Sequence, residues 1–316
     1  MTRSIYRFSP LPRRELVRLA GLLMAVAFAL TACQQVPPEV SRAEESAVSE
    51  ADRTATVRSF YQLAFVEKKV ADAADRYLGG TYVQHNPGVA DGPKAFKDAF
   101  TGYFSSAPAV SYTVHRVLAE KDLVLVHAEQ RGDPASPVIA IMDLFRVDST
   151  GKIVEHWDAV QPVPGKSTNG HTMFDGPVGT RPSPSPQTRE QNREAALEFL
   201  DLAFNRANAK TAVELYVADQ YTQHNPRLAD GGAAFVSAFA GAERLTGDAK
   251  RVFPRTIVDG NLVAVHTYGR NPDNTGSGSI DIFRFDQNNK IAEHWDAVQS
   301  YPARTASGNT VWDDGR

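Results

Sequence analysis

The feature that most constrains this chain is an internal repeat, because motifs that recur in the same order indicate two copies of one folding unit. The repeated blocks keep their order, and their spacing changes by one residue after the block that ends at 127. They are YVQHNP at 82–87 and YTQHNP at 221–226, ADG at 90–92 and 229–231, LVLVH at 123–127 and LVAVH at 262–266, DLFR at 143–146 and DIFR at 281–284, and EHWDAVQ at 155–161 and 293–299. The sequence therefore predicts a tandem repeat of one domain.

The spacer between the copies sets the expected domain boundaries. RPSPSP at 181–186 places proline at alternate positions, which favours an extended, semi-rigid segment. We therefore expect one domain at 51–175, a Pro/Ser linker at 176–187 and a second domain at 188–316. A chain of 316 residues has room for two domains of this size.

The N-terminal segment, 1–33, is typical of a bacterial lipoprotein signal peptide. Five arginines in the first eighteen residues precede an uncharged run from Leu19 to Ala32, which is shorter than the roughly 20 apolar residues of a membrane-spanning helix. We expect cleavage before Cys33, the only cysteine, and its acylation, with a polar tether at 34–50. This predicts a lipid-anchored protein of the bacterial cell envelope, exported to the periplasmic side of a membrane or to the cell surface. An uncleaved anchor and twin-arginine export are the alternatives.

Within each copy the hydrophobic pattern changes from helical to strand-like spacing. In the first copy, helical spacing predicts three helices, at about 57–65, 70–78 and 93–104. Four segments rich in β-branched and aromatic residues follow, at 110–119, 123–131, 138–147 and 153–161. Helices followed by antiparallel strands indicate the α+β class. We expect two cone-shaped domains, each with three helices packed on a curved antiparallel sheet that encloses one pocket.

The order of elements, the His-Asn-Pro turn and the DLFR strand joined by a Gly-Lys turn to EHWD resemble the SnoaL-like polyketide cyclases of the nuclear transport factor 2-like superfamily, which also contains ketosteroid isomerases. The likeness covers nearly all of both copies. It implies that Asp158 and Asp296 match the family aspartate that acts as general acid/base in an intramolecular aldol condensation. The family histidine falls on Asp143 and Asp281, which is a departure from the family. The family's first-helix tyrosine falls near Phe65 and Phe204, which is a second departure.

Strand alternation groups the polar residues into candidate sites, since it places His156 and Asp158 on one face and Trp157 on the other. Removal of a proton next to a carbonyl needs a base close to the carbon and a donor near the oxygen. The candidate catalytic residues are Asp158, Asp296, His156 and His294. The candidate pocket residues are His85, Asn86, His127, Asp143, His224, Asn225, His266 and Asp281.

Each candidate also has a structural interpretation. The His-Asn-Pro segment is typical of a turn, Asp158 could pair with Arg146, His127 could be a core histidine, and a buried Asp143 must be hydrogen-bonded in any case. Trp157 and its counterpart are expected in a core or an interface. A mixed metal site is a further alternative, but the spacing matches no compact metal signature. We expect neither a metal nor another cofactor.

Two functions remain open at this stage. The leading hypothesis is an envelope lipoprotein with two pockets for a small apolar or carbonyl-containing molecule, with aldol, cyclase or isomerase chemistry; the alternative is a noncatalytic module that binds a ligand or a protein. A net charge of −3 disfavours nucleic-acid binding. The two copies could pack as an internal pseudo-dimer. Their ends differ, with Asn309 and Trp312 in place of His171 and Phe174, so their ligands could differ too.

Overall fold

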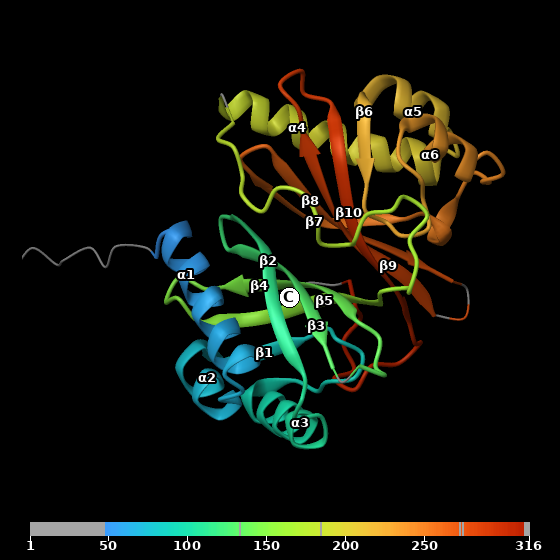
Figure 1. Cartoon of the computed structure of the whole chain (residues 1–316). Coiled ribbons are helices and arrows are strands. Elements are labelled where there is room, and N and C mark those ends of the chain that lie inside the picture. Colours follow the sequence, from blue (N-terminus) through green and yellow to red (C-terminus); the bar gives the residue numbers. More distant parts are fainter. Residues whose placement is uncertain (1–47, 133, 184, 272, 274, 313–316) are drawn as a thin grey trace, which may run out of the picture. The chain divides into compact units, whose positions relative to one another are not determined.

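The computed structural model describes residues 48–312 except 133, 184, 272 and 274. The expected signal peptide, the acylated Cys33 and most of the tether lie outside the described residues. In the part of the chain that is described, no helix combines the length and the apolar character needed to cross a membrane. Each of the two repeats contributes three α-helices and a five-stranded sheet, and Figure 1 shows the helices of each repeat on one face of its sheet.

The first domain begins with a capped helix. The Ser49 hydroxyl accepts a hydrogen bond from the Asp52 backbone N–H, and the Asp52 carboxylate accepts one from the Ser49 backbone N–H, which forms a capping box. The elements are α1 (Glu50–Tyr61), a π-helical turn (Gln62–Val66), α2 (Val70–Tyr77), β1 (Leu78–Gln84), α3 (Gly92–Ser106), β2 (Ser111–Glu120), β3 (Leu123–Arg131), β4 (Ile139–Val147) and β5 (Ile153–Pro162). The sequence pattern anticipated all of these except the π-helical turn and β1.

Strand β1 completes the sheet at one edge. The strand order is β1-β5-β4-β3-β2, and all pairs are antiparallel, as expected, except that β1 runs parallel to β5. Its glycines, Gly79 and Gly80, and the following His-Asn-Pro turn hid this strand from the sequence pattern. The pairing places Gln84 beside His156.

The second domain repeats this arrangement. The sheet order is β6-β10-β9-β8-β7, again with one parallel pair, between β6 and β10. The elements are α4 (Pro186–Leu200), a π-helical turn (Asp201–Asn205), α5 (Ala209–Tyr216), β6 (Val217–Gln223), α6 (Gly232–Ala238), a 3-10 turn (Gly247–Ala249), β7 (Val252–Asp259), β8 (Leu262–Arg270), β9 (Gly276–Phe285) and β10 (Ile291–Tyr301). Helix α6 is much shorter than its counterpart α3, yet both segments supply two phenylalanines to the cavity of their domain, Phe96 and Phe100 in the first and Phe235 and Phe239 in the second.

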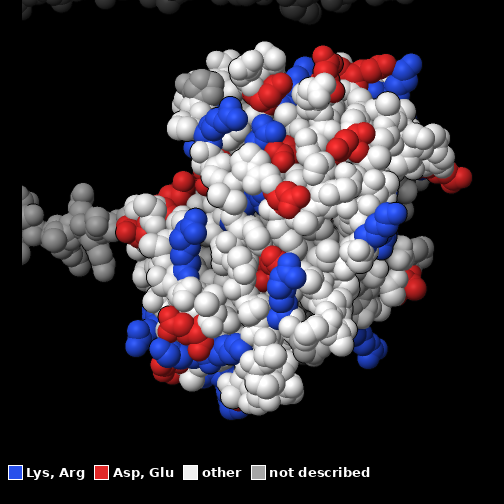
Figure 2. All heavy atoms as spheres, viewed as in Figure 1, with Lys and Arg blue, Asp and Glu red and all other residues white. Residues whose placement is uncertain are grey.

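Each sheet is apolar on both faces. The inner face packs against the helices of its own domain and forms that domain's core. Side chains on the outer faces of the two sheets form one further apolar cluster that draws residues from both domains, including Trp157 and Trp295, which are fully buried. This explains why the strands lack a clean alternation of apolar and polar residues. On the surface seen in Figure 2, acidic and basic side chains are interspersed rather than gathered by sign.

Candidate functional site

Strands β4 and β5 bring two carboxylates and one imidazole together on the inner face of the first sheet. Asp143 lies directly opposite Asp158 in the strand register, and His156 lies two residues before Asp158 on the same face. His156 Nε2 is 3.0 Å from Asp143 Oδ1. All three side chains are buried. The second domain repeats this trio with Asp281, His294 and Asp296, and with the same 3.0 Å contact.

The hydrogen bonds of His156 indicate that its ring is doubly protonated. Gln84 Oε1 accepts a bond from the Asn86 backbone N–H at 2.8 Å, which fixes this oxygen as the atom that faces His156 Nδ1 at 2.7 Å. Both ring nitrogens therefore donate, one to Gln84 and one to the Asp143 carboxylate. Burial opposes the positive charge, but the hydrogen bond and charge of Asp143 raise the pKa of His156 above its usual value.

Asp158 and Asp296 each have one oxygen with no protein partner. Asn86 Nδ2 donates to Asp158 Oδ2 at 2.5 Å, and Asn225 Nδ2 donates to Asp296 Oδ2 at 2.7 Å. The other oxygen, Oδ1, is buried in both residues without a hydrogen-bond partner among the described atoms. Burial raises the pKa of each carboxyl to about 6, with the neighbouring carboxylate adding to the shift and the imidazolium opposing it.

The trio of each domain lines an apolar cavity. The first cavity has a volume of about 130 Å³ and aromatic walls that include Phe65, Phe96 and Tyr112. The second has a volume of about 330 Å³. Asn86 reaches the first cavity, as do Asp143, His156 and Asp158. A carboxylate with a free oxygen, a pKa near neutrality and an apolar cavity can accept a proton from a bound molecule.

The comparisons with known proteins bear on this arrangement. The family model for the SnoaL-like domain matches residues 57–156 and 196–294, which together make up more than half of the chain. The chain belongs to the SnoaL-like family. No curated protein matches it. Among solved structures it is similar to TsrD from Streptomyces laurentii, with 20% identity over 35% of this chain and 90% of that chain and a TM-score of 0.32. A steroid delta-isomerase from Pseudomonas aeruginosa is also similar, with 20% identity over 37% of this chain and 85% of that chain and a TM-score of 0.30.

Two of the expected pocket residues, His85 and its counterpart His224, lie outside the SnoaL-like cavities, and this corrects the sequence prediction. Because alternation along β1 directs Gln84 inward, His85 faces the other side of the sheet. There its ring stacks on Trp157 with centroids 5.0 Å apart, and its Nε2 is 3.0 Å from Glu155 Oε1. His224 stacks on Trp295 in the same way, at 4.8 Å.

His127 and His266 are a second correction. Both are buried on the outer face of their sheets, where each contacts an arginine; His127 Nδ1 is 3.2 Å from Arg116 Nη1. Burial, with the nearby arginine, lowers the pKa of His127 well below its usual value and that of His266 to about 3, so both rings are neutral. The prediction assumed that an apolar strand face lines a cavity, but these faces are covered by the other domain.

The structure also decides between the alternatives for Asp158 and Asp143. Arg146 pairs with Glu155 at 2.7 Å and with Asp122 at 2.6 Å, so it is not the partner of Asp158. Asp143 is hydrogen-bonded to His156, as the structural interpretation required, and it also lines the cavity, as the pocket interpretation required.

Metal binding by the trio is poorly supported by its donors. The ligand atoms of Asp143, His156 and Asp158 lie within 4.8 Å of one another, and the same holds in the second domain. Both nitrogens of His156 donate hydrogen bonds in this arrangement, however, so a metal would have to displace the proton on Nε2 that binds Asp143. His127, which the sequence offered as a fourth ligand, lies on the opposite face of the sheet.

Sequence reasoning missed several residues of the site. Gln84 and Gln223 orient the histidines, and they could have been found because they belong to the repeated Tyr-x-Gln-His-Asn-Pro block. Arg251, in the wall of the second cavity, stands where the first repeat has Tyr112, so the comparison of the repeats gave no signal for a shared arginine.

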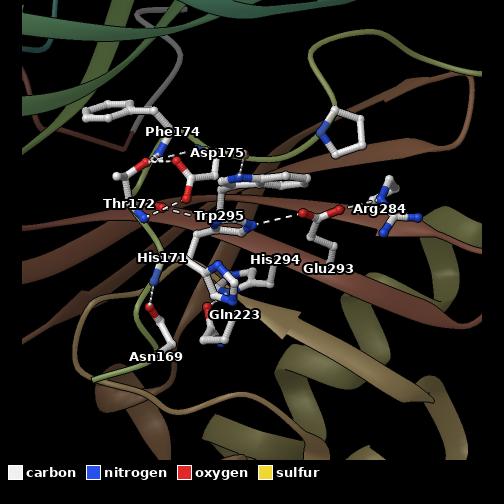
Figure 3. A network of polar contacts seen from close by, with 12 residues as sticks. Asn169, His171, Thr172, Phe174, Asp175, Gln223, Arg284, Glu293, His294 and Trp295 are labelled. Atoms are coloured by element: carbon white, nitrogen blue, oxygen red, sulfur yellow. Dashed lines mark hydrogen bonds and ion pairs between the residues drawn. The ribbon is translucent and has the colours of Figure 1, made fainter. Parts of the chain in front are cut away.

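The His-Asn-Pro turn of each SnoaL-like domain is held by the C-terminal segment of the other domain. Figure 3 shows Thr172 and Asp175 of the first domain near Trp295 of the second. The Thr172 carbonyl oxygen lies 2.9 Å from His224 Nδ1, and Asn169 Nδ2 donates to the Asn225 carbonyl at 2.9 Å. Reciprocally, Asn309 Nδ2 donates to the Gln84 carbonyl at 3.1 Å. Since these turns present the asparagines that bind Asp158 and Asp296, each site depends on both domains.

Proposed function

We propose that each SnoaL-like domain binds a small carbonyl compound and removes a proton next to the carbonyl, in an aldol, cyclase or isomerase reaction. The base is Asp158 in the first domain and Asp296 in the second. The observation that carries this proposal is the Oδ1 atom of each carboxylate, which is buried in both copies without a hydrogen-bond partner among the residues that the structure describes. Leaving a buried acceptor unsatisfied costs roughly 1–3 kcal/mol, so its recurrence in both copies is better explained by a ligand than by packing.

The neighbours of Asp158 suit this role. Asn86 holds Oδ2, which leaves Oδ1 directed to accept the proton. The His156 imidazolium, held by Asp143, supplies a positive charge that favours the enolate formed when the proton leaves. A carboxyl with a pKa of about 6 is ionised at neutral pH and is a stronger base than an exposed aspartate. No step requires a group that the chain does not itself contain.

Exchange of α-protons tests this activity directly. The full chain is incubated in D₂O with a panel of small ketones and aldehydes, and deuterium uptake at the α-carbon is followed by NMR. In the double variant Asp158→Asn with Asp296→Asn, the enzyme-dependent exchange rate should fall by a factor of about 10²–10⁴. Asp98→Asn, on the surface and paired with Lys94, is the matched control and should keep it. Exchange that is equally fast in the double variant would refute the general-base assignment.

A noncatalytic binding module is the second candidate, because a cavity walled by aromatic side chains such as Phe65, Phe96 and Tyr112 can hold an apolar ligand without reacting with it. Native mass spectrometry of protein purified from its host tests the idea. A ligand that remains chemically unchanged after long incubation supports binding alone, and its conversion to a product contradicts it.

We further propose that the protein is a lipid-anchored lipoprotein of the bacterial cell envelope. The support is the arginine-rich start, the uncharged run of fourteen residues and the LTAC segment that ends at Cys33. Mass spectrometry of the protein from membranes should find an acylated Cys33 as the first residue. Cys33→Ser should release the protein from the membrane fraction. Detection of an unmodified N-terminus in the membrane-bound protein would contradict this proposal.

We also propose that the two domains form an internal pseudo-dimer with matching contacts in both directions. The Val160 backbone N–H donates to Gln299 Oε1, and the Val298 backbone N–H donates to Gln161 Oε1, both at 2.7 Å. Arg116 lies 4.1 Å from the Trp295 ring, and Arg255 lies 3.6 Å from the Trp157 ring. Such reciprocal contacts are those expected of a two-fold interface.

Cleavage of the linker tests the pseudo-dimer. A protease site inserted after Val178, which is 65% exposed, allows the chain to be cut between the domains. If the outer faces form a stable interface, the two fragments should elute together in size-exclusion chromatography. Fragments that separate and remain folded would show that the linker alone holds the domains together.

A further inference from the structure

The two cavities differ in charge although their trios are the same. Among the described residues, those that line the first cavity include no lysine or arginine, whereas Arg227 and Arg251 line the second. Arg251 occupies the position of Tyr112, since each lies four residues before the arginine that contacts the outer-face histidine. Arg227 replaces Gly88 two residues after the asparagine of the site.

The Arg251 guanidinium is held in place without an acidic partner. Its backbone is fixed by Asn205, which accepts from the Arg251 N–H at 2.8 Å and donates to its carbonyl at 3.0 Å. Its guanidinium carbon lies 5.1 Å from the centre of the Phe204 ring. Within the described part of the chain, the guanidinium makes no hydrogen bond or ion pair. Burial lowers its pKa, and the charge of Asp281 only partly offsets this cost.

Asp281, whose charge acts on Arg251, already has hydrogen-bond partners on both of its oxygens. Asp281 accepts from His294 through one oxygen, and from the hydroxyls of Ser279 at 2.7 Å and Thr267 at 3.3 Å through the other. In the first domain the positions of these two hydroxyls are held by apolar residues. Compared with the first domain, the second domain has two additional hydroxyl groups that bind the Asp281 carboxylate. It also has an additional arginine, Arg251, that these hydroxyl groups and Asp281 do not bind. The cavity is also larger, at about 330 Å³ against 130 Å³.

We propose that the second cavity binds an organic carboxylate, and that Arg251 is the residue that selects it, while the first cavity takes an uncharged molecule. An arginine fork matches a carboxylate through two parallel hydrogen bonds, which is stronger than a neutral pair. Arg227, exposed near the mouth, adds attraction for an anion. The inference deepens the proposed function, because a keto acid would place its carboxylate at Arg251 and its acidic C–H near Asp296.

A matched pair of ligands tests the charge selectivity. Binding of 4-phenyl-2-oxobutanoate and of its methyl ester to the full chain is measured by calorimetry. The acid should bind more tightly than the ester. Arg251→Gln should weaken binding of the acid about tenfold or more and leave the ester nearly unchanged. Arg251→Lys should restore part of the loss. Arg244→Gln, an exposed arginine outside the cavity lining, is the control and should change neither.

Three results would overturn the assignment: no binding of the acid to the unsubstituted chain, equal weakening of acid and ester in Arg251→Gln, or unchanged binding of the acid in a folded Arg251→Gln variant. Folding of each variant is checked by its thermal unfolding. The Asp296→Asn variant separates this inference from the catalytic proposal, because it should still bind the acid even if turnover is lost. Should Asp296→Asn turn over the keto acid normally, the catalytic role of Asp296 fails while Arg251 remains the carboxylate site.

Discussion

Replacing Asp158 with Asn should change the stability of the protein by an amount that depends strongly on pH. Burial raises the pKa of Asp158 from 3.8 to about 6, so the native state retains a proton that the unfolded chain has already lost between these values. Folding is therefore opposed by ionisation of this group. The favourable contribution of the protonated Asp158 carboxyl to the free energy of unfolding is fully present below pH 4 and is lost as the pH rises through 6. Asparagine cannot ionise, so an asparagine at this position makes a contribution to the free energy of unfolding that does not change between pH 4 and pH 8.

The magnitude follows from the size of the shift. Roughly two pKa units at 1.36 kcal/mol each give about 3 kcal/mol. The free energy of unfolding of Asp158→Asn, relative to the unsubstituted chain, should therefore rise by up to about 3 kcal/mol between pH 4 and pH 8. This is an upper limit, because loss of the Asp158 charge also weakens the support for the His156 imidazolium. Asparagine can still accept the hydrogen bond from Asn86, so the packing is conserved.

Urea unfolding at pH 4, 6 and 8, followed by tryptophan fluorescence, measures this difference. Asp98→Asn is again the control, because its pair with Lys94 is exposed and such pairs contribute at most about 1 kcal/mol. A difference between Asp158→Asn and the unsubstituted chain that does not change with pH would refute the reasoning. So would a difference that falls as the pH rises, because the sign is set by the direction of the pKa shift.

Three further predictions concern activity and the domain contact. Proton exchange on a carbonyl substrate should rise with pH through about 6, since Asp158 and Asp296 must be ionised to act as bases; a rate that is flat from pH 5 to 8 would contradict their role. Asn86→Ala removes the donor to Asp158, so it should raise the pKa seen in that pH profile and lower the rate at pH 6. Arg255→Ala should lower the free energy of unfolding by about 1–3 kcal/mol, through loss of its contact with Trp157, as measured by urea unfolding; a change below 0.5 kcal/mol would show that the contact is unimportant.

Much of the fold was accessible from the sequence. The repeated blocks indicated two domains, and the expected strand at 123–131 agrees with β3 at both ends. The expected helix at 93–104 lies within α3. These elements were predictable because their periodicity is local and strong. Strand β1 was not, because its glycines and the adjacent turn lack the strand pattern, and its position depends on pairing with β5.

The candidate site was only partly accessible. Alternation correctly separated His156 and Asp158 from Trp157, since that split depends only on the period of a strand. It did not show which face of the sheet encloses a cavity. His85 and His127 were therefore expected in the pocket, whereas each lies on the outer face.

The amino-acid sequence by itself determined the duplication, the three helices and four of the five strands of a repeat, and the split of His156 and Asp158 from Trp157, because these follow from local periodicity. The tertiary structure alone decided what covers each face. It buried the outer face of both sheets, left one oxygen of Asp158 without a hydrogen-bond partner in the described part of the chain and placed Arg251 in a cavity wall. Burial depends on contacts between elements that are distant along the chain. The environment that sets a pKa or selects a ligand therefore cannot be predicted from the pattern of any one segment.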